Sequence, residues 1–269
     1  METKQITQKE IRPVNGILML ILITIGIVAA IALIILGAFF LNDGSTAAGV
    51  AMLVVGILGT IICPVLYAGL KVVGPNEALV LTLFGNYYGT ILKQGFYYVN
   101  PFATYNNPAY MNALEKAKAA AASVETEKGR RGSSGSVKVN AKKTISLKDT
   151  TLNNGIQKVN DVMGNPVIIG AVVIWKVIDP TKAVFNVEDY TEFLSIQTDS
   201  TIRNISRMYP YDLLQTEEHE NSTEKTLRGS AQEIADNMKT ELSKKVEFAG
   251  LEIQEVRITH LSYAEEIAA

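Results

Sequence analysis

Two long apolar runs near the N-terminus dominate the pattern of hydrophobic and polar positions. The runs cover residues 17–41 and 47–70, contain no charged residue, and are separated only by the short stretch 42–46. A bilayer core about 30 Å thick needs roughly 20 apolar helical residues to cross it, so each run is long enough for one crossing. We therefore predict a two-helix transmembrane hairpin over 17–70, preceded by an N-terminal tail over 1–16.

A secretory signal peptide is the competing interpretation of the first run. Signal peptides carry an apolar core of roughly 7–15 residues followed by a cleavage site with small residues. The first run is longer than such a core, and a second apolar run follows it almost at once. These two observations favour a membrane anchor.

Basic residues beside the runs indicate the orientation of the hairpin. Lys4, Lys9 and Arg12 precede the first run, Lys71 follows the second, and the stretch between the runs has no Lys or Arg. The positive-inside rule then places both chain termini in the cytoplasm, with two spans in the cell membrane. Because neither run contains a charge, we expect the hairpin to anchor the chain and not to conduct ions or protons.

Small residues within the runs predict how the two helices touch. Gly26 with Ala30, and Ala47 with Ala51, form pairs spaced four apart, a spacing that allows membrane helices to approach closely. Cys63 is the only cysteine, so an intrachain disulfide is excluded. Its place inside the second run favours a small packed side chain over redox chemistry or acylation.

Strand-forming residues follow the hairpin. Residues 77–84 and 90–99 read as strands, with a hairpin turn over 85–89. Residues 113–140 look like a flexible insertion with a basic bias. We favour a solvated loop for this insertion, and the alternative is a polybasic contact with anionic lipid.

The strongest strand pattern covers residues 166–179. Alternate positions are apolar on both faces, so we expect a central strand that is covered on both sides. The segment is too short and too rich in β-branched residues for a third span. Helical spacing follows over 187–209 and 227–242, and a last strand over 251–259 shifts its apolar phase between Ile253 and Val256, which indicates a bulge. The order of elements predicts an α+β domain over 72–263, with a new helix beginning over 264–269.

Composition and motifs argue against several functions. The formal net charge is −2, which disfavours nucleic acid as a partner. The two histidines, His219 and His260, lack the spacing of a zinc site, and no P-loop, dinucleotide or Gly-x-Ser-x-Gly fingerprint occurs. The acidic cluster 217–220 fits a solvated loop better than a metal site. We therefore expect no catalytic, cofactor-binding or metal-binding residues, no cofactor, and no enzyme.

Several landmarks together resemble one known family. The chain is similar to SPFH (band 7) domains over roughly 72–269, in the order of the motifs and in their spacing. The landmarks are Gly74-Pro75-Asn76-Glu77, Phe84-Gly85, Gly89-Thr90, Gly95, Asn100-Pro101-Phe102, Lys158-Val159-Asn160-Asp161, Gly164-Asn165-Pro166, Trp175-Lys176-Val177, Asp179-Pro180, Ala183, Arg203, Tyr209-Pro210-Tyr211-Asp212, Leu227-Arg228, Gly250 to Thr259, and Tyr263 to Ala268.

The resemblance implies kinship with stomatins, flotillins and prohibitins. Such proteins are tethered to membranes, assemble into rings or cages, organise membrane microdomains, regulate membrane proteases and channels, and have no catalytic residues of their own. The family usually continues into a long coiled coil after the region that matches 263–269, so this chain is expected to be a fragment of such a protein. The insertion near 113–140 has no counterpart from which a role could be carried over.

Three functions remain open at this point. The leading hypothesis is a membrane-anchored oligomeric scaffold that organises membrane microdomains and their proteins. The alternative is a regulatory subunit of a membrane protease or channel, and the third is a hydrolase with an unrecognised site, since a missing motif does not exclude one. The expected partners are membrane lipids, further copies of the chain, and a membrane protease or channel.

Overall fold

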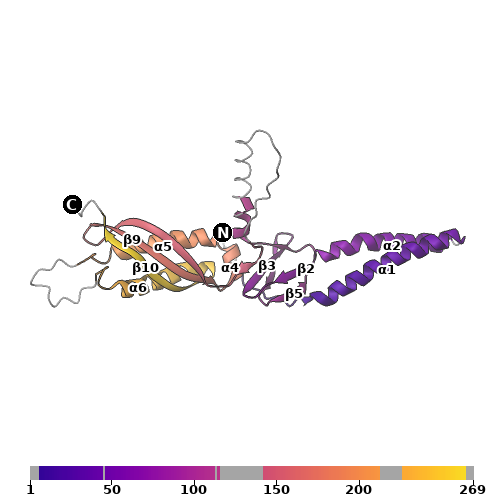
Figure 1. Ribbon diagram of the computed structural model, residues 1–269, viewed down its shortest axis with the longest axis horizontal. Helices are drawn as coiled ribbons and strands as arrows, with labels where there is room; N and C mark the ends of the chain where they lie inside the picture. The colour runs from indigo at the N-terminus through magenta and orange to yellow at the C-terminus, as the bar shows by residue number, and fades with distance from the viewer. Residues whose placement is uncertain (1–5, 45, 113, 116–141, 213–225, 265–269) are drawn as a thin grey trace, which may run out of the picture. The chain divides into compact units, whose positions relative to one another are not determined.

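The computed structural model describes residues 6–44, 46–112, 114–115, 142–212 and 226–264 (Figure 1). The chain divides into two compact units. One, here called the hairpin unit, comprises Lys9–Asn106 and Lys143–Ile145. The other, here called the C-terminal unit, comprises Met1–Gln8, Asn107–Lys142 and Ser146–Ala269.

The two apolar runs form the long helices α1 (Gly16–Asn42) and α2 (Thr46–Tyr67). Both are long and apolar enough to cross a membrane, and only 11% of the most apolar window of each is buried. A core helix of a soluble protein would be mostly buried, so these exposed apolar surfaces fit a lipid environment. The expected second span reaches Leu70, but the helix ends at Tyr67. Gly69 already lies against β5, because a Cβ built on it would stand 2.5 Å from the carbonyl oxygen of Val99.

Small residues line the contact between α1 and α2. The buried positions of α1 are Gly16, Ile23, Ala30 and Gly37, and those of α2 are Gly49 and Gly56. A Cβ built on Gly56 would stand 2.8 Å from the carbonyl oxygen of Ala30, so the backbones touch almost directly. The predicted role of Ala30 is confirmed, whereas Ala47 and Ala51 are exposed. The true spacing is seven residues, which keeps one seam of each helix facing its partner.

Both legs of the hairpin enter one small antiparallel sheet. The strand β1 (Val14–Asn15) precedes α1 directly, and β2 (Leu70–Val73) follows α2 after a short turn. Both pair with β5 (Gly95–Tyr98), so that Tyr98 stands between Val14 and Leu70. Figure 1 shows β2 and β5 beside the ends of the helices. The sheet therefore fixes where each leg begins and ends.

A second sheet completes the hairpin unit. Its central strand is β3 (Glu77–Leu83). The other strands each pair with β3, namely β4 (Asn86–Ile91), β6 (Thr104–Tyr105) and β7 (Ile145–Ser146). The two sheets enclose a core of Val73, Leu79, Leu81, Ile91, Val99 and Ala103. The predicted turn over 85–89 is wrong, because β4 already begins at Asn86. Phe84 and Gly85 form the turn, with φ of 48° and 83°, as a two-residue hairpin of this hand requires.

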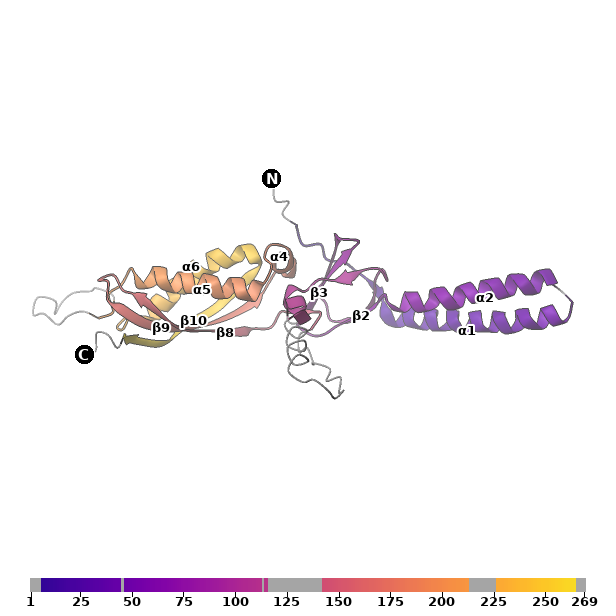
Figure 2. The ribbon, with the colours of Figure 1, turned by 90° about the horizontal axis from the view of Figure 1, so that it is seen from above.

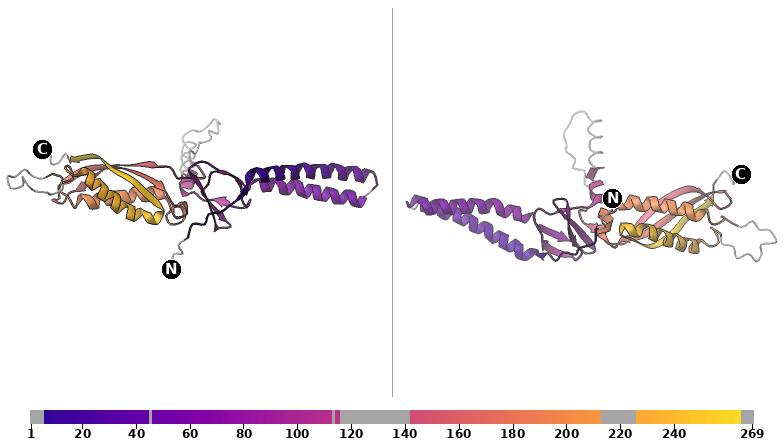
Figure 3. Two further views of the ribbon diagram at one scale, coloured as in Figure 1. Left: turned by 90° about the horizontal axis from the view of Figure 1, so that it is seen from below. Right: turned by 180° about the vertical axis from the view of Figure 1, so that it is seen from behind.

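The C-terminal unit is a three-stranded antiparallel sheet with helices on one face (Figure 2). The strand order is β10 (Leu251–Tyr263), β9 (Pro166–Val177), β8 (Thr150–Asn160). The helices α5 (Tyr190–Ser206) and α6 (Ala231–Val246) lie together on this face, which the views from below and behind also show (Figure 3). Their packing buries one face of β9, namely Val167, Ile169, Ala171, Val173, Trp175 and Val177.

The prediction that β9 is covered on both faces is wrong within the described part of the chain. Ile168, Val172 and Ile174 on its other face are only half-buried, and Ile178 beyond its end is 54% exposed. Among the described residues, helices cover one side of this sheet only, so this apolar row stays partly exposed. The apolar pattern of β9 thus reflects its central place between two strands more than a second covering layer.

Other predicted elements shift by a few residues. The helix expected over 187–209 is α5, preceded by the unexpected short helix α4 (Pro180–Phe185), and the helix expected over 227–242 is α6, which ends in the 3₁₀ turn η2 (Glu247–Ala249). The predicted bulge in β10 is confirmed between Ile253 and Glu255. The cluster 217–220, most of the insertion 113–140, and residues 265–269 of the expected last helix lie outside the described residues.

The hairpin packing predicts a specific cross-link. A Cβ built on Gly26 would lie 3.4 Å from the Sγ atom of Cys63, close enough for a disulfide. We expect Gly26→Cys to form an intrachain disulfide with Cys63 under mild oxidation in membranes, detected as the loss of two hydrogen masses and of thiol reactivity. Val28→Cys is the matched control, because Val28 is 63% exposed and faces away from α2. Equal cross-linking of both variants would contradict the packing of α1 on α2.

Candidate functional site

The carboxylate of Asp161 joins two segments that are far apart in the sequence. Asp161 is only 4% exposed and follows β8 directly. Its Oδ1 atom accepts hydrogen bonds from the backbone N–H groups of Met163 at 2.9 Å and Asn165 at 2.8 Å, which closes the turn into β9. Its Oδ2 atom accepts from the backbone N–H of Tyr211 at 3.2 Å. One buried charge therefore holds both the β8–β9 turn and the segment after α5.

Aromatic side chains extend this junction. The backbone N–H of Val162 donates to the carbonyl oxygen of Tyr209, and the Tyr209 hydroxyl accepts from the Asn237 amide on α6 at 3.1 Å. The Tyr211 and Tyr263 rings lie with their centroids 4.0 Å apart. The sequence landmarks around Asp161 and Tyr211 thus form one structural joint, although no local pattern indicated that they meet.

A second joint connects the end of β9 to the start of β10. The Asp179 carboxylate caps α4 by accepting from the N–H groups of Thr181 and Lys182, each at 3.0 Å. The N–H groups of Ile178 and Asp179 both donate to the carbonyl oxygen of Gly250. Gly250 has a φ of +69°, and a Cβ built there would stand 2.4 Å from the carbonyl oxygen of Asp179. Only glycine fits this position without moving the backbone.

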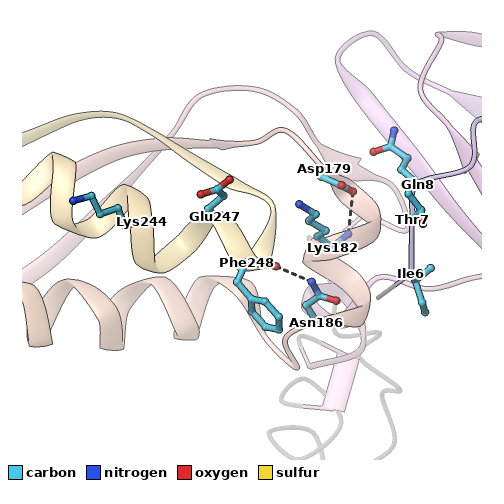
Figure 4. Close-up of a pocket in the computed structure, with 9 residues that line it drawn as sticks. All are labelled: Ile6, Thr7, Gln8, Asp179, Lys182, Asn186, Lys244, Glu247 and Phe248. Atoms are coloured by element: carbon cyan, nitrogen blue, oxygen red, sulfur yellow. Dashed lines mark hydrogen bonds between the residues drawn. The ribbon is translucent and has the colours of Figure 1, made fainter. Parts of the chain in front are cut away.

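A cavity of about 480 Å³ lies beside this second joint (Figure 4). It is lined by Ile6, Thr7, Gln8, Asp179, Lys182, Asn186, Lys244, Glu247 and Phe248. Figure 4 shows Lys182 and Asn186 on the α4 side, facing Lys244, Glu247 and Phe248 on the α6–η2 side. The Asn186 amide donates to the carbonyl oxygen of Phe248 at 2.7 Å, which ties the two sides together.

The chemistry of this cavity suits binding more than catalysis. Its described lining contains no serine, cysteine or histidine, and its ionisable side chains are Asp179, Lys182, Lys244 and Glu247. The Asp179 carboxylate is already used to cap α4. Across the described ranges, no group of three or more His, Cys, Asp and Glu side chains could hold a metal ion. Lys182 and Lys244 give the cavity two cationic side chains.

An acidic depression adjoins the cavity and shares two of its residues, Asn186 and Phe248. Its volume is about 570 Å³, and Glu188, Asp189 and Glu192 contribute carboxylates to it. Phe248 and Ile196 place apolar side chains there, and they are 54% and 57% exposed. The surface therefore has a half of mixed charge, with Lys182 and Lys244 beside Asp179 and Glu247, and an acidic half, and the exposed Phe248 ring lines both. We call it the Phe248 surface.

Tyr190 and His260 are two further ionisable groups of this unit. Burial raises the pKa of Tyr190 to about 12, with a smaller contribution from the charge of Asp189, so this hydroxyl stays protonated at neutral pH. Its ring meets Trp175 edge to face at 6.0 Å. His260 is exposed and its Nε2 contacts the Ser262 hydroxyl at 3.1 Å, with no acid completing a triad among the described residues. His219 lies outside the described part of the chain.

The Asp161 joint predicts a large, local loss of stability. We expect Asp161→Ala to lower the free energy of unfolding by about 2–4 kcal/mol, because the N–H groups of Met163, Asn165 and Tyr211 all lose the buried carboxylate that accepts from them. Asp161→Asn should cost less, since its amide oxygen can still accept. Asp236→Ala on the exposed side of α6 is the matched control, with about 0.5 kcal/mol or less. Thermal unfolding followed by the fluorescence of Trp175 measures all three, and equal losses for the Asp161→Ala and Asp236→Ala variants would contradict the joint.

The chain matches the model of one protein family. The model of the SPFH domain / Band 7 family matches residues 71–269, a range that begins directly after the two apolar helices and contains both joints. No curated protein matches the chain. The match confirms the resemblance seen in the sequence, and two apolar helices followed by an α+β domain with antiparallel sheets are consistent with it. Since the matched range covers well over half of the chain, the protein belongs to the SPFH domain / Band 7 family.

Proposed function

We propose that the chain is a membrane-anchored scaffold. Its hairpin crosses the cell membrane twice, its α+β domain lies on the cytoplasmic side, and its copies assemble to organise membrane microdomains and the proteins within them. The observation that carries the proposal is the family match beginning at residue 71, directly after two helices whose apolar surfaces stay exposed. Members of the SPFH/Band 7 family are generally membrane-associated scaffolds and generally not enzymes.

The exposed side chains of the hairpin support the anchoring role. Ile17, Val28 and Phe39 are between 60% and 68% exposed, and large apolar side chains cover the outward surface of both helices. In water so much contiguous apolar surface would drive aggregation, whereas in a bilayer it is solvated by lipid. The inward seam is rich in small residues, namely Ala30, Gly37, Gly49 and Gly56, which is typical of helix contacts within membranes.

The Phe248 surface supports self-association. An exposed aromatic ring stands between the Lys182 and Lys244 side and the Glu188 and Glu192 side. Such a surface can pair with a second copy of itself, because Lys182 and Lys244 of one copy can face the Glu188 and Glu192 carboxylates of the other. Burying the Phe248 ring at the centre would add the apolar contact that charge pairs alone lack.

The orientation can be tested by thiol labelling in intact cells. In a Cys63→Ala background, we expect Asp43→Cys, between the two helices, to react with a membrane-impermeant maleimide from outside. Glu10→Cys, in the N-terminal tail, should react only after permeabilisation, because the positive-inside rule places it in the cytoplasm. The opposite pattern would reverse the proposed orientation, and labelling of both in intact cells would contradict a hairpin that crosses the membrane.

Assembly can be tested with two differently tagged full chains expressed together. In mild detergent we expect each tag to recover the other and light scattering to give a mass of several copies. Phe248→Ser should lower the recovered copy number several-fold. Ile178→Ser is the matched control, because both side chains are 54% exposed and only Phe248 lies on the proposed contact. Monodisperse monomers of the unsubstituted chain, or one stoichiometric foreign partner in place of self-copies, would contradict the scaffold.

A further inference from the structure

Two exposed phenylalanine rings stand together on the hairpin unit. Phe84 is 81% exposed and Phe102 is 59% exposed. Their centroids are 6.1 Å apart and the rings are stacked with an angle of 27° between their planes. Each ring covers part of the other, but the rest of both faces the surroundings. An aromatic pair of this exposure is unusual on a surface that meets only water.

The backbone of Phe84 adds a second observation. Phe84 is the first residue of the β3–β4 turn and has a φ of 48°, in the left-handed region that glycine and asparagine prefer. A bulky aromatic residue is disfavoured there by its Cβ. Both the backbone conformation and the exposure of position 84 therefore make phenylalanine an unfavourable residue there in the isolated chain. A strained, exposed residue of this kind points to a contact outside the chain.

The aromatic pair lies near the end of the hairpin unit from which the two apolar helices extend. The Val99 N–H donates at 2.9 Å to the carbonyl oxygen of Gly69, two residues after the end of α2. Phe102 follows in the next turn, where its N–H donates to Oδ1 of Asn100 at 3.0 Å. The other neighbour of β5 is β1, which leads straight into α1. Phe102 thus follows, by a few residues, the part of β5 that lies beside the start of α1 and the end of α2.

Positive charge is gathered at the same end of the hairpin. The ammonium of Lys71 lies 4.7 Å from the centroid of the Tyr105 ring, and that of Lys143 lies 4.5 Å from it. Lys143 also donates a hydrogen bond to the Tyr105 hydroxyl at 2.9 Å, and this bond lowers the pKa of the hydroxyl, with smaller contributions from both lysine charges. Lys71 follows α2 by four residues. This charge is complementary to anionic lipid headgroups.

We propose that the Phe84–Phe102 pair is embedded in the headgroup region of the bilayer that holds the hairpin, with Lys71 and Lys143 favouring anionic lipid around it. This inference rests on the proposed membrane crossing and adds to it a specific lateral contact. Aromatic rings are well suited to this depth, where apolar faces are removed from water while nearby polar groups stay hydrated. The contact would hold the hairpin unit at a fixed height on the membrane surface.

The test uses the full chain reconstituted in vesicles whose lipids carry bromine atoms high in the acyl chains. Phe102→Trp places a fluorescent probe in the pair, and bromine quenches tryptophan only at close range. Gln94→Trp is the matched control, since Gln94 is exposed next to Gly95, which pairs with Val73 at the end of β2 farthest from α2. Phe39→Trp, at a position 68% exposed near the far end of α1, reports whether the hairpin is inserted in the bilayer. The native Trp175 is 4% exposed, and its signal is measured in the unsubstituted chain and subtracted.

We expect Phe102→Trp to be quenched at least about twofold more than Gln94→Trp, with emission shifted to shorter wavelength. With bromine on the anionic lipid only, quenching should exceed that with bromine on the zwitterionic lipid at equal mole fraction. Combining Phe102→Trp with Lys71→Gln and Lys143→Gln should abolish this difference, as should high salt.

Quenching of Phe102→Trp no stronger than that of Gln94→Trp would overturn the inference. If Phe39→Trp is quenched in that case, only the lateral contact fails and the anchor stands. If Phe39→Trp is not quenched either, the membrane crossing itself fails. Short-wavelength emission of Phe102→Trp without lipid quenching would show that protein, such as a second copy, covers the pair, which also overturns the contact with lipid. A lipid preference that persists in the lysine variants would remove Lys71 and Lys143 from the proposal.

Discussion

The small sheet β1–β5–β2 is the constraint on which the hairpin unit depends. Two apolar helices that meet through small residues have few directional contacts between them, so their ends must be fixed elsewhere. Backbone hydrogen bonds on both edges of β5 do this, because one edge holds the residues before α1 and the other holds the residues after α2. Glycine at positions 16 and 69 makes the arrangement feasible, since a Cβ on either would collide with β5 or the residue after it. The register of a four-residue strand thereby sets the register of two helices relative to each other.

The C-terminal unit uses a different device, a buried polar joint. Asp161 and Asp179 each accept two or more backbone N–H bonds at the end of a strand, one at each end of β9. Carboxylates that accept several N–H bonds are strong, directional links, and here they fix the turns at both ends of β9. Such a domain keeps one face of its sheet open while its turns stay fixed.

Long-period patterns were readable from the sequence, and contacts between distant segments were not. The hairpin, the strand β9, the helices α5 and α6 and the bulge in β10 follow from hydrophobic periodicity and from residue type. The turn at Phe84 and Gly85 was missed because phenylalanine is a poor residue for positive φ, so the rule that finds most hairpin turns pointed to the later glycine. The apolar outer row of β9 was misread because periodicity reports apolar character and not what covers it. The joint between Asp161 and Tyr211, and the Phe248 surface, depend on pairs 50 or more residues apart, for which a single sequence has no local signal.

The edges of the C-terminal sheet bear on how copies could associate. An open three-stranded sheet invites strand addition at its edges unless they are interrupted. Within the described residues, the edge strand β8 carries an irregularity between Asn153 and Ile156, with Gly155 at a φ of +67°, and β10 carries two more. Charged side chains at Glu252, Glu255 and Arg257 further line the β10 edge. Continuous strand pairing between copies is therefore disfavoured on both sides of the sheet. The proposed self-association would then use surfaces beside the helices. The Phe248 surface lies there and has the exposed ring and the side chains of both charges that such a contact needs.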